Sequence, residues 1–232
     1  LAPAPGTTPA MRASSHRARD VRGALENAFD DCNNRWQRHA GSAAGSAASC
    51  AVALVLGGAL FSAHVGDCRA VLCRGDLSSD PHPGDEDGPL AVTLTVPDHI
   101  VDVEAERDRA LELGAALSRS GDYVAGAGGI RIRVTRCFGA NGVPGVSALP
   151  DVSATILRPA DTLVVAADQA VWQTFSAQDA VENVLWSIRH EDVGAMVLSE
   201  FAQANAAPRD EEGPAAVVLY LSQDGYGLQR PR

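Results

Sequence analysis

The sequence has few aromatic residues, which make up 5% of the chain, and it lacks the motifs of several common protein classes. There is no CxxC pair, which disfavours a zinc site, and no HxH or HExxH spacing among the six histidines. There is also no Walker loop, no GxGxxG turn and no internal repeat. The longest apolar run, residues 51–65, is too short to span a bilayer as a helix.

Basic residues are outnumbered by acidic ones, which gives a formal charge of −10 and a pI of about 5.0. Binding to nucleic acid requires a clustered basic face. The arginine-containing segments at residues 12–22 and 131–136 are interpreted as solvated surface. Nucleic acid is therefore not an expected partner.

The five cysteines are odd in number and do not follow a disulfide framework. This usage is typical of free, mostly buried thiols in a reducing intracellular compartment. The chain begins at Leu1, in a stretch rich in Ala, Pro, Thr and Ser. A linker, an expression fragment and the product of organellar import processing stay open as explanations of that stretch, and the compartment stays unassigned.

Hydrophobic periodicity predicts one domain over residues 16–224, between an N-terminal linker (1–15) and a C-terminal tail (225–232). Gly57-Gly58 predicts a hairpin between two buried strands, and Ser176 with Asp179 predicts a helix cap. The spacing predicts helices at residues 16–39, 98–115, 177–190 and 191–206. It predicts further strands at residues 91–96, 128–136, 151–158, 161–167 and 215–222. Hairpin-like neighbours without regular βαβ repeats favour an antiparallel α+β fold.

Five sequence blocks, which together cover residues 21–221, resemble one known family in order and spacing. The block ASCAVALVLGGALFSAHVGDCRAVLCRGD resembles two core strands that end in NVGDSRAVL, and LTVPDHIVDVEAERDRALELGA resembles a block with a DH pair and an ExxR helix. IRVTRCFGA resembles LAVSRAFGD, and PRDEEGPAAVVLYL resembles the closing GSxDNITVIVVxL. PDVSATILRPADTLVVAADQAVWQTFSAQDAVENV resembles PEVxxxxLxxxDEFLILASDGLWDVLSxQEAVxxV. The family is that of the PP2C-type (PPM) metal-dependent Ser/Thr protein phosphatases.

The resemblance implies two packed antiparallel sheets flanked by helix pairs, in α/β/β/α layers. The family's first acidic motifs, which precede the helix expected at residues 16–39, are absent from this chain. The strands that carry those motifs are therefore expected to be missing. Their absence would expose a sheet edge, and we expect residues 1–15, an upstream segment or a partner chain to shield it.

The resemblance also implies a site where two Mg²⁺ or Mn²⁺ ions activate a water that attacks a phosphoserine or phosphothreonine. Such ions need several converging carboxylates, because hard dications take oxygen ligands. Several family positions carry other residues in this chain. Gln169 and Ala170 stand at the Asp and Gly of the SDG motif, Gln173 and Ala140 replace further Asp residues, and Gly213 and Pro214 replace the closing Asp-Asn pair.

Asp67 and Asp168 are the residual candidates for metal binding. Asp67 keeps its family position and is interpreted as a turn residue. Asp168 lies one position before the family Asp, and a one-residue bulge would be needed to turn it into the site. Asp210, Glu211 or Glu212 would additionally have to replace the closing Asp. No metal cofactor is therefore expected.

The sequence thus favours a pseudophosphatase that acts as a protein-binding scaffold or regulatory subunit. The resemblance suggests a kinase, a phosphoprotein or a multi-subunit complex as the partner. Two alternatives stay open. One is an active Mg²⁺- or Mn²⁺-dependent phosphatase with acids upstream of Leu1, and the other is a structural subunit of a large assembly.

Overall fold

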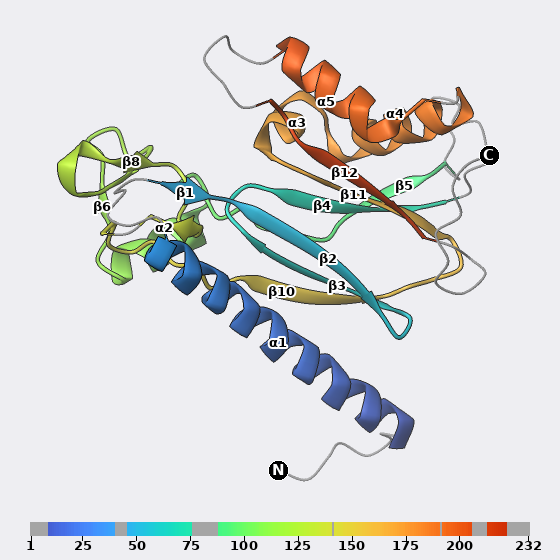
Figure 1. Ribbon diagram of the computed structural model, residues 1–232, viewed down its shortest axis with the longest axis horizontal. Coiled ribbons are helices and arrows are strands. Elements are labelled where there is room, and N and C mark those ends of the chain that lie inside the picture. Colours follow the sequence, from blue (N-terminus) through green and yellow to red (C-terminus); the bar gives the residue numbers. More distant parts are fainter. Residues whose placement is uncertain are drawn as a thin grey trace.

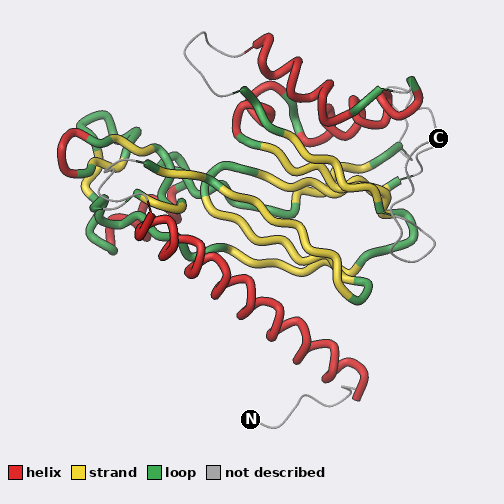
Figure 2. The backbone as a smooth tube through the Cα atoms, in the orientation of Figure 1, coloured by secondary structure: helices red, strands yellow, loops and turns green. Residues whose placement is uncertain are grey.

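The computed structural model describes residues 9–39, 46–75, 88–140, 142–190, 192–205 and 213–221, with side chains from residue 18 onward. Two antiparallel sheets form two layers, with helices on their outer sides (Figure 1). Figure 2 shows the same layers as two groups of strands between helical segments. The expected α+β fold with α/β/β/α layers is confirmed.

The first sheet has three strands in the order β10-β3-β2. They are β2 (Cys50–Leu56), β3 (Ala59–Val65) and β10 (Asp151–Ile156). The second sheet has four strands in the order β12-β11-β4-β5. They are β4 (Arg69–Arg74), β5 (Leu90–Thr93), β11 (Asp161–Ala167) and β12 (Ala216–Tyr220).

Side chains from both sheets meet in an apolar layer between them. Leu60 of β3 packs with Leu72 of β4 and Val164 of β11, and all three are buried. A strand that is buried on both faces has a nearly continuous apolar sequence, which explains the apolar residues that follow one another in β11.

Helices cover the outer faces of the two sheets. Helix α1 (Pro9–His39) runs along the β10-β3-β2 sheet, where Phe29 packs in one buried cluster with Ala63 of β3 and Val152 of β10. Three helices, α3 (Gln169–Thr174), α4 (Ala177–Arg189) and α5 (Gly194–Asn205), lie over the other sheet. Trp172, Leu185 and Leu198 form the core between that sheet and its helices.

A small lobe comes between β5 and β10 in the sequence and lies at one end of the sandwich (Figure 1). It contains α2 (Glu104–Glu112), the strands β6 (Ala116–Leu117), β7 (Val124–Ala125) and β8 (Arg131–Ile132), and the short 3-10 helix Ala127–Gly129. A further pair, β1 (Ala47–Ala48) and β9 (Phe138–Gly139), connects the lobe to the region near α1.

Local signals predicted several elements correctly. Gly57 and Gly58 have the positive φ values of a tight hairpin turn. Ser176 and Asp179 form a reciprocal capping box at the start of α4. Both features depend on neighbouring residues only, so the sequence was sufficient to predict them.

Other boundaries differ from the prediction. Helix α1 begins at Pro9 instead of residue 16, and α2 is confined to Glu104–Glu112. The strand expected at 128–136 is wrong beyond Arg131–Ile132. There the backbone bonds to the segment before α2 instead of a continuous neighbour, with Val101 N–H donating to Arg133 O and Thr135 N–H to His99 O.

No helix among the described residues is long and apolar enough to cross a membrane.

The outer side of β2 leaves the side chains of Leu54 and Leu56 exposed to solvent, and β12 exposes Val217. The expectation that residues 1–15 shield an edge falls partly on residues 1–8, outside the described part. It stays a prediction, as do the domain boundaries.

Candidate functional site

Asp168 lies where β11 ends and α3 begins. It is the N-cap of α3, and its Oδ1 accepts a hydrogen bond from Val171 N–H at 3.3 Å. Its Oδ2 accepts from Ala215 N–H at 2.8 Å, and its own N–H donates to Ala215 O at 3.1 Å. Both carboxylate oxygens thus join β11 to α3 and to the residues before β12. The register irregularity of β11 lies between Asp161 and Leu163, and the pairing with β4 is regular from there to Ala167, the residue before Asp168.

Asp67 lies in the turn between β3 and β4. Ser49 Oγ donates a hydrogen bond to Asp67 Oδ1 at 2.8 Å. Gly66, with φ +84°, allows Ser49 to come this close, because a Cβ at Gly66 would lie 2.1 Å from Ser49 Oγ. This contact fits the interpretation of Asp67 as a turn residue, with a side-chain hydroxyl as its donor.

The half-buried thiol of Cys68 lies near both residual carboxylates. Burial raises the pKa of Cys68 to about 12, and the charges of Asp67 and Asp168 act in the same direction. The thiolate is the nucleophilic and metal-binding form of cysteine. Cys68 is therefore protonated at neutral pH and adds no anionic ligand to this region.

The positions at which the sequence predicts replaced family residues lie in three places. Gln169 and Ala170 form the first turn of α3, beside Asp168, and Gly213 and Pro214 lie just before β12. Ala140 is buried in the lobe with φ +50°, a backbone conformation that Asp and Asn adopt more readily than Ala. The family Asp at this position is thus compatible with the backbone, while the methyl of Ala140 packs in an apolar cluster.

Across the described residues, no group of three or more His, Cys, Asp and Glu side chains is arranged to hold a metal ion. Asp210, Glu211 and Glu212 lie outside these residues. Three acids act on Cys68 here: Asp67, Asp168 and Asp98. Asp67 and Asp168 accept hydrogen bonds from Ser49 and from backbone N–H groups, and Asp98 forms an ion pair with Arg69. This donor set does not fit a dinuclear Mg²⁺ or Mn²⁺ centre, which needs converging carboxylates.

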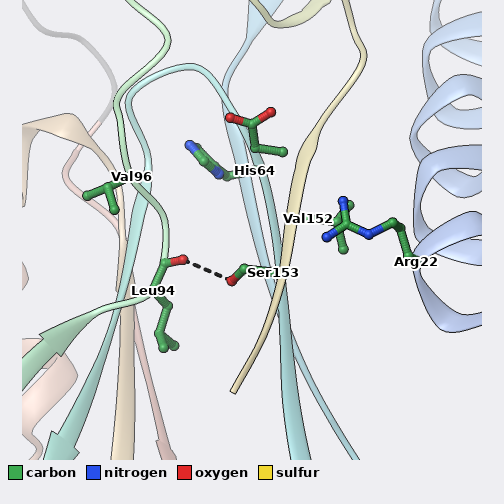
Figure 3. Close-up of a pocket in the computed structure, with 7 residues that line it drawn as sticks. Arg22, His64, Leu94, Val96, Val152 and Ser153 are labelled. Atoms are coloured by element: carbon green, nitrogen blue, oxygen red, sulfur yellow. Dashed lines mark hydrogen bonds between the residues drawn. The ribbon is translucent and has the colours of Figure 1, made fainter. Parts of the chain in front are cut away.

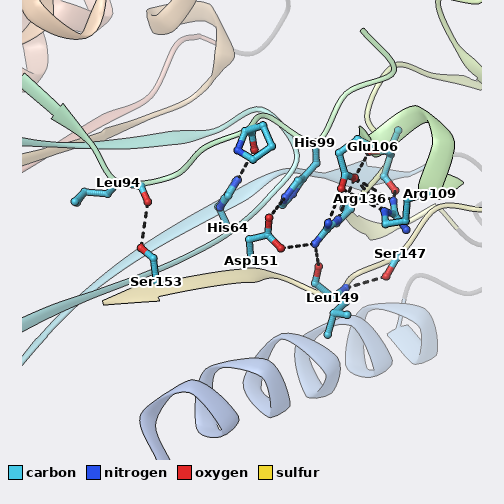
Figure 4. Close-up of polar contacts among 12 residues, drawn as sticks. His64, Leu94, His99, Glu106, Arg109, Arg136, Ser147, Leu149, Asp151 and Ser153 are labelled. Atoms are coloured by element: carbon cyan, nitrogen blue, oxygen red, sulfur yellow. Dashed lines mark hydrogen bonds and ion pairs between the residues drawn. The ribbon is translucent and has the colours of Figure 1, made fainter. Parts of the chain in front are cut away.

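A network of buried and half-buried ion pairs joins the lobe to the sandwich (Figure 4). Glu106 of α2 is 4% exposed and accepts hydrogen bonds from Thr135 Oγ1 at 2.7 Å and from Arg136 Nε at 3.0 Å. Arg109 adds a longer contact from the same helix at 3.2 Å. Arg136 also donates to Asp151 Oδ1 at 2.7 Å, so one guanidinium connects α2 to β10.

The pKa values in the network follow from its hydrogen bonds. Burial alone would raise the pKa of Glu106, but hydrogen bonds from Arg136 and Thr135 outweigh it and lower the pKa. Burial also opposes ionisation of Asp151, where His99 and Arg136 lower the pKa. Both carboxylates are therefore anions at neutral pH and serve to position the lobe.

Sequence analysis did not predict this network. Its members lie in separate sequence blocks: Glu106 in the ExxR helix, Arg136 in IRVTRCFGA and Asp151 at the start of PDV. One feature of the sequence could have indicated the network: charged residues recur inside these blocks, whose other residues are mostly apolar and form the core. Arg69 and Asp98 follow the same pattern and form a two-bond ion pair at 2.7 and 2.5 Å.

A pocket of about 240 Å³ lies beside this network, at the outer edge of β10 (Figure 3). It is lined by side chains from both faces of β10, by His64 of β3 and by Arg22 of α1. Ser153 Oγ donates to Leu94 O at 3.3 Å within it. The pocket therefore adjoins the histidine of β3 and lies apart from Asp168.

Replacing Asp168 with Ala is expected to lower the free energy of unfolding by about 1–2 kcal/mol, because the helix cap and the bond to Ala215 are both lost. Asp168→Asn retains one acceptor oxygen but points its NH2 group at the other backbone N–H, so it should lose an intermediate amount. Urea denaturation at pH 7 with and without Mn²⁺ measures both. If Asp168 instead binds metal, Mn²⁺ should raise the free energy of unfolding of the parent chain and leave those of both variants unchanged.

Comparisons with known proteins agree on one family. The family model for protein phosphatase 2C matches residues 7–211. "Probable protein phosphatase 2C 43" of Arabidopsis thaliana is 31% identical over 78% of this chain and 40% of its own length. The "Protein kinase and PP2C-like domain-containing protein" of Oryza sativa subsp. japonica is 28% identical over 73% of this chain and 23% of its own length. The chain thus spans about half or less of the length of the curated relatives that it matches.

Solved structures agree on the fold. The serine-threonine phosphatase 2C of Toxoplasma gondii superposes with a TM-score of 0.75 at 18% identity, over 93% of this chain and 72% of the other. A C. elegans sex-determining protein superposes with a TM-score of 0.61 at 19% identity, over 94% of this chain and 48% of the other. At these identities the likeness concerns the fold alone, whereas the family model covers most of the sequence. The chain belongs to the protein phosphatase 2C family.

Proposed function

We propose that this chain is a catalytically inactive PP2C-like domain that acts by binding proteins, as a scaffold or regulatory subunit. The family normally consists of metal-dependent Ser/Thr phosphatases. The observation that carries the proposal is the state of Asp168. Both of its oxygens accept backbone hydrogen bonds, while the residue at the family's metal-binding position is the neutral Gln169.

The charge at the site supports the same proposal. Two Mg²⁺ or Mn²⁺ ions close together require several anionic oxygens. The side chains at the corresponding positions are an amide, a methyl group, a hydrogen and a proline ring, in Gln169, Ala140, Gly213 and Pro214. Asp67 alone does not neutralise two dications.

The intact core supports a role that depends on the fold. The inter-sheet layer, the capping box of α4 and the ion network around Glu106 are all present. A protein that retains these features and has lost the acids still presents a stable surface. A kinase is the partner class to test first, because one relative carries a protein kinase and a PP2C-like domain in its name.

The test is phosphate release from phosphoserine and phosphothreonine peptides in excess Mn²⁺, beside an active PP2C phosphatase. The expected result is no release above the blank from the parent chain. Turnover that disappears in Asp67→Ala or Asp168→Ala, and persists in the exposed control Asp122→Ala, would overturn the proposal. Calorimetric titration with Mn²⁺ adds a readout other than activity, and we expect no saturable heat.

The binding half of the proposal needs its own measurement. Immobilised chain should retain purified kinase domains at micromolar concentration, and the variant Asp168→Asn should retain them equally well, because metal binding is not required. Retention that depends on added Mn²⁺ would argue against an inert site. Absence of any retained kinase would remove that partner class and leave phosphoproteins and larger assemblies to be tested.

A further inference from the structure

Two histidines are stacked inside the molecule, next to the ion network (Figure 4). His64 of β3 is 2% exposed and His99, in the segment before α2, is 0% exposed. Their ring centroids lie 4.2 Å apart and their planes differ by 10°. The motif NVGDSRAVL, which this part of the chain resembles, has Asn where this chain has His64, so the second imidazole is a departure from that pattern.

The hydrogen bonds assign the protons of the two rings. His64 Nε2 lies 3.0 Å from Pro97 O, and His99 Nε2 lies 3.2 Å from Asp151 Oδ2. Carbonyl and carboxylate oxygens accept only, so each ring carries its proton on Nε2 and is unprotonated at Nδ1 when neutral. The pair is then uncharged.

The Nδ1 atom of His99 is buried and has no hydrogen-bond partner within the described structure. Unpartnered buried polar atoms are rare in folded proteins and costly. A single metal ion does not fit both rings, because the Nδ1 lone pairs of stacked parallel rings lie in separate planes. A proton that reaches this atom would meet no acceptor and would add a positive charge beside Arg136.

The surroundings disfavour protonation of both rings. Burial lowers the pKa of His99 to about 4, and His64 and Arg136 act in the same direction. Burial is also the main reason why the pKa of His64 is lowered. The charged groups that surround the pair are Asp151 of β10, Arg136 before β9, Glu106 of α2, Asp98 after β5 and, at the pocket, Arg22 of α1. The three acids among them already form ion pairs with arginines.

The main chain of His99 also forms hydrogen bonds to two separate segments. Its N–H donates to Gly66 O at 2.9 Å, and its carbonyl accepts from Thr135 N–H at 2.8 Å. The first bond holds the turn that carries Asp67, and the second holds the lobe. A change in the position of His99 therefore affects the turn and the lobe together.

We propose that the His64–His99 pair is a proton-operated latch, which joins the Asp67 turn to the lobe while both rings are neutral and opens when the pair takes up a proton. Opening moves the charged ring away from Arg136 and breaks the bonds to Gly66 and Thr135. The inference concerns the fold and does not depend on whether the chain is catalytically active.

The direction of the pH effect follows from linkage. A histidine has a pKa near 6.5 when exposed in the open state, and the pKa of His99 is about 4 in the closed state. Between these values the open state binds more protons, so the closed state is favoured above pH 6.5 and loses stability as the pH falls towards 4. His99 alone should raise the opening constant about 20-fold between pH 7 and pH 5. The pKa values of Glu106 and Asp151 are also lowered in the closed state, so these carboxylates add to the loss of stability in the same direction as the pH falls into the usual carboxyl range.

The test is amide hydrogen exchange at pH 7 and pH 5, corrected for the intrinsic exchange rates. We expect residues 62–68, 94–103 and 131–137 to open about 20-fold more at pH 5, while β11 and α4 do not change. His99→Gln keeps a donor towards Asp151 and His64→Gln keeps one towards Pro97, and neither side chain titrates. Both variants should reduce the pH effect. His190→Gln, at an exposed histidine after α4, should retain it in full.

Two results would overturn the latch. One is an equal pH effect in the parent chain, His64→Gln and His99→Gln, and the other is a pH effect spread evenly over both sheets. If His99→Gln does not fold, the ring proton signals of the parent chain provide an independent measurement. A His99 ring that titrates below pH 5 in the folded protein supports the proposal, and one that titrates at pH 5 or above contradicts it.

Discussion

Replacing Glu106 with Ala is expected to lower the free energy of unfolding by about 3–5 kcal/mol at pH 7. Glu106 is buried and accepts hydrogen bonds from Thr135 Oγ1 and from two arginines, so its removal leaves Arg136 without its main counter-ion. The loss reflects the charge left unpaired, and a neutral pair of similar volume would cost less. Urea denaturation followed by circular dichroism measures the change.

Two variants separate burial from charge at this position. Glu106→Gln keeps a hydrogen-bond acceptor without the charge and should lose an intermediate amount. Glu104→Ala removes an exposed glutamate from the same helix and should change stability by no more than about 0.5 kcal/mol. Equal losses for Glu104→Ala and Glu106→Ala would mean that the network does not hold the lobe.

The same residue affects the acid side of the stability profile. The pKa of Glu106 is lowered in the folded state, so the unfolded state binds more protons as the pH falls below about 4.5. The stabilisation from Glu106 is therefore present above that pH and is lost below it. Between pH 5 and pH 3, Glu106→Gln should lose less stability than the parent chain.

Sequence patterns predicted the elements that are determined locally. The hairpin turn at Gly57-Gly58 and the capping box of Ser176 depend on residues within a few positions of each other. The apolar run Asp161–Ala167 forms β11 because it is buried on both faces. Helix α3 was not predicted, because six residues around Trp172 give too short a periodic pattern.

The lobe was predicted poorly because its conformation depends on distant residues. The bonds of His99 and Thr135 connect segments that are far apart in the sequence, and no local period encodes them. The candidate site could be predicted only in part. Matching Trp172 to the family motif predicts that Gln169 stands at the family's metal-binding Asp, and this stays a prediction. The hydrogen bonds of Asp168 could not be predicted, since its partner Ala215 is far away in the sequence.

Asp168 and Glu106 together indicate how charge is used in this member of the family. A buried or partly buried carboxylate is stable only when its oxygens are satisfied. Asp168 is satisfied by N–H groups of α3 and of the segment before β12, and Glu106 by Thr135 and arginines. Neither acid requires a cation from solution, so the fold can keep both with no metal bound.

The apolar layer between the sheets provides the second large effect. Replacing Leu72 with Ala is expected to lower the free energy of unfolding by about 3–5 kcal/mol, because the lost methyl groups leave a cavity that close-packed neighbours cannot fill. Leu72 is 0% exposed and belongs to the buried cluster with Leu60 and Val164 from two other strands. Urea denaturation at pH 7 measures the change, and the slope of the transition should stay the same.

Leu90→Ala is the matched control, since it makes the same chemical change in the neighbouring strand. Leu90 pairs with Arg74 at the edge of the same sheet and is 56% exposed, so little apolar surface is lost from the core. Its expected cost is below about 1 kcal/mol. If the two variants are equally destabilised, the sheets do not pack through Leu72, and the layered arrangement on which the positions of Asp67 and Asp168 depend is incorrect.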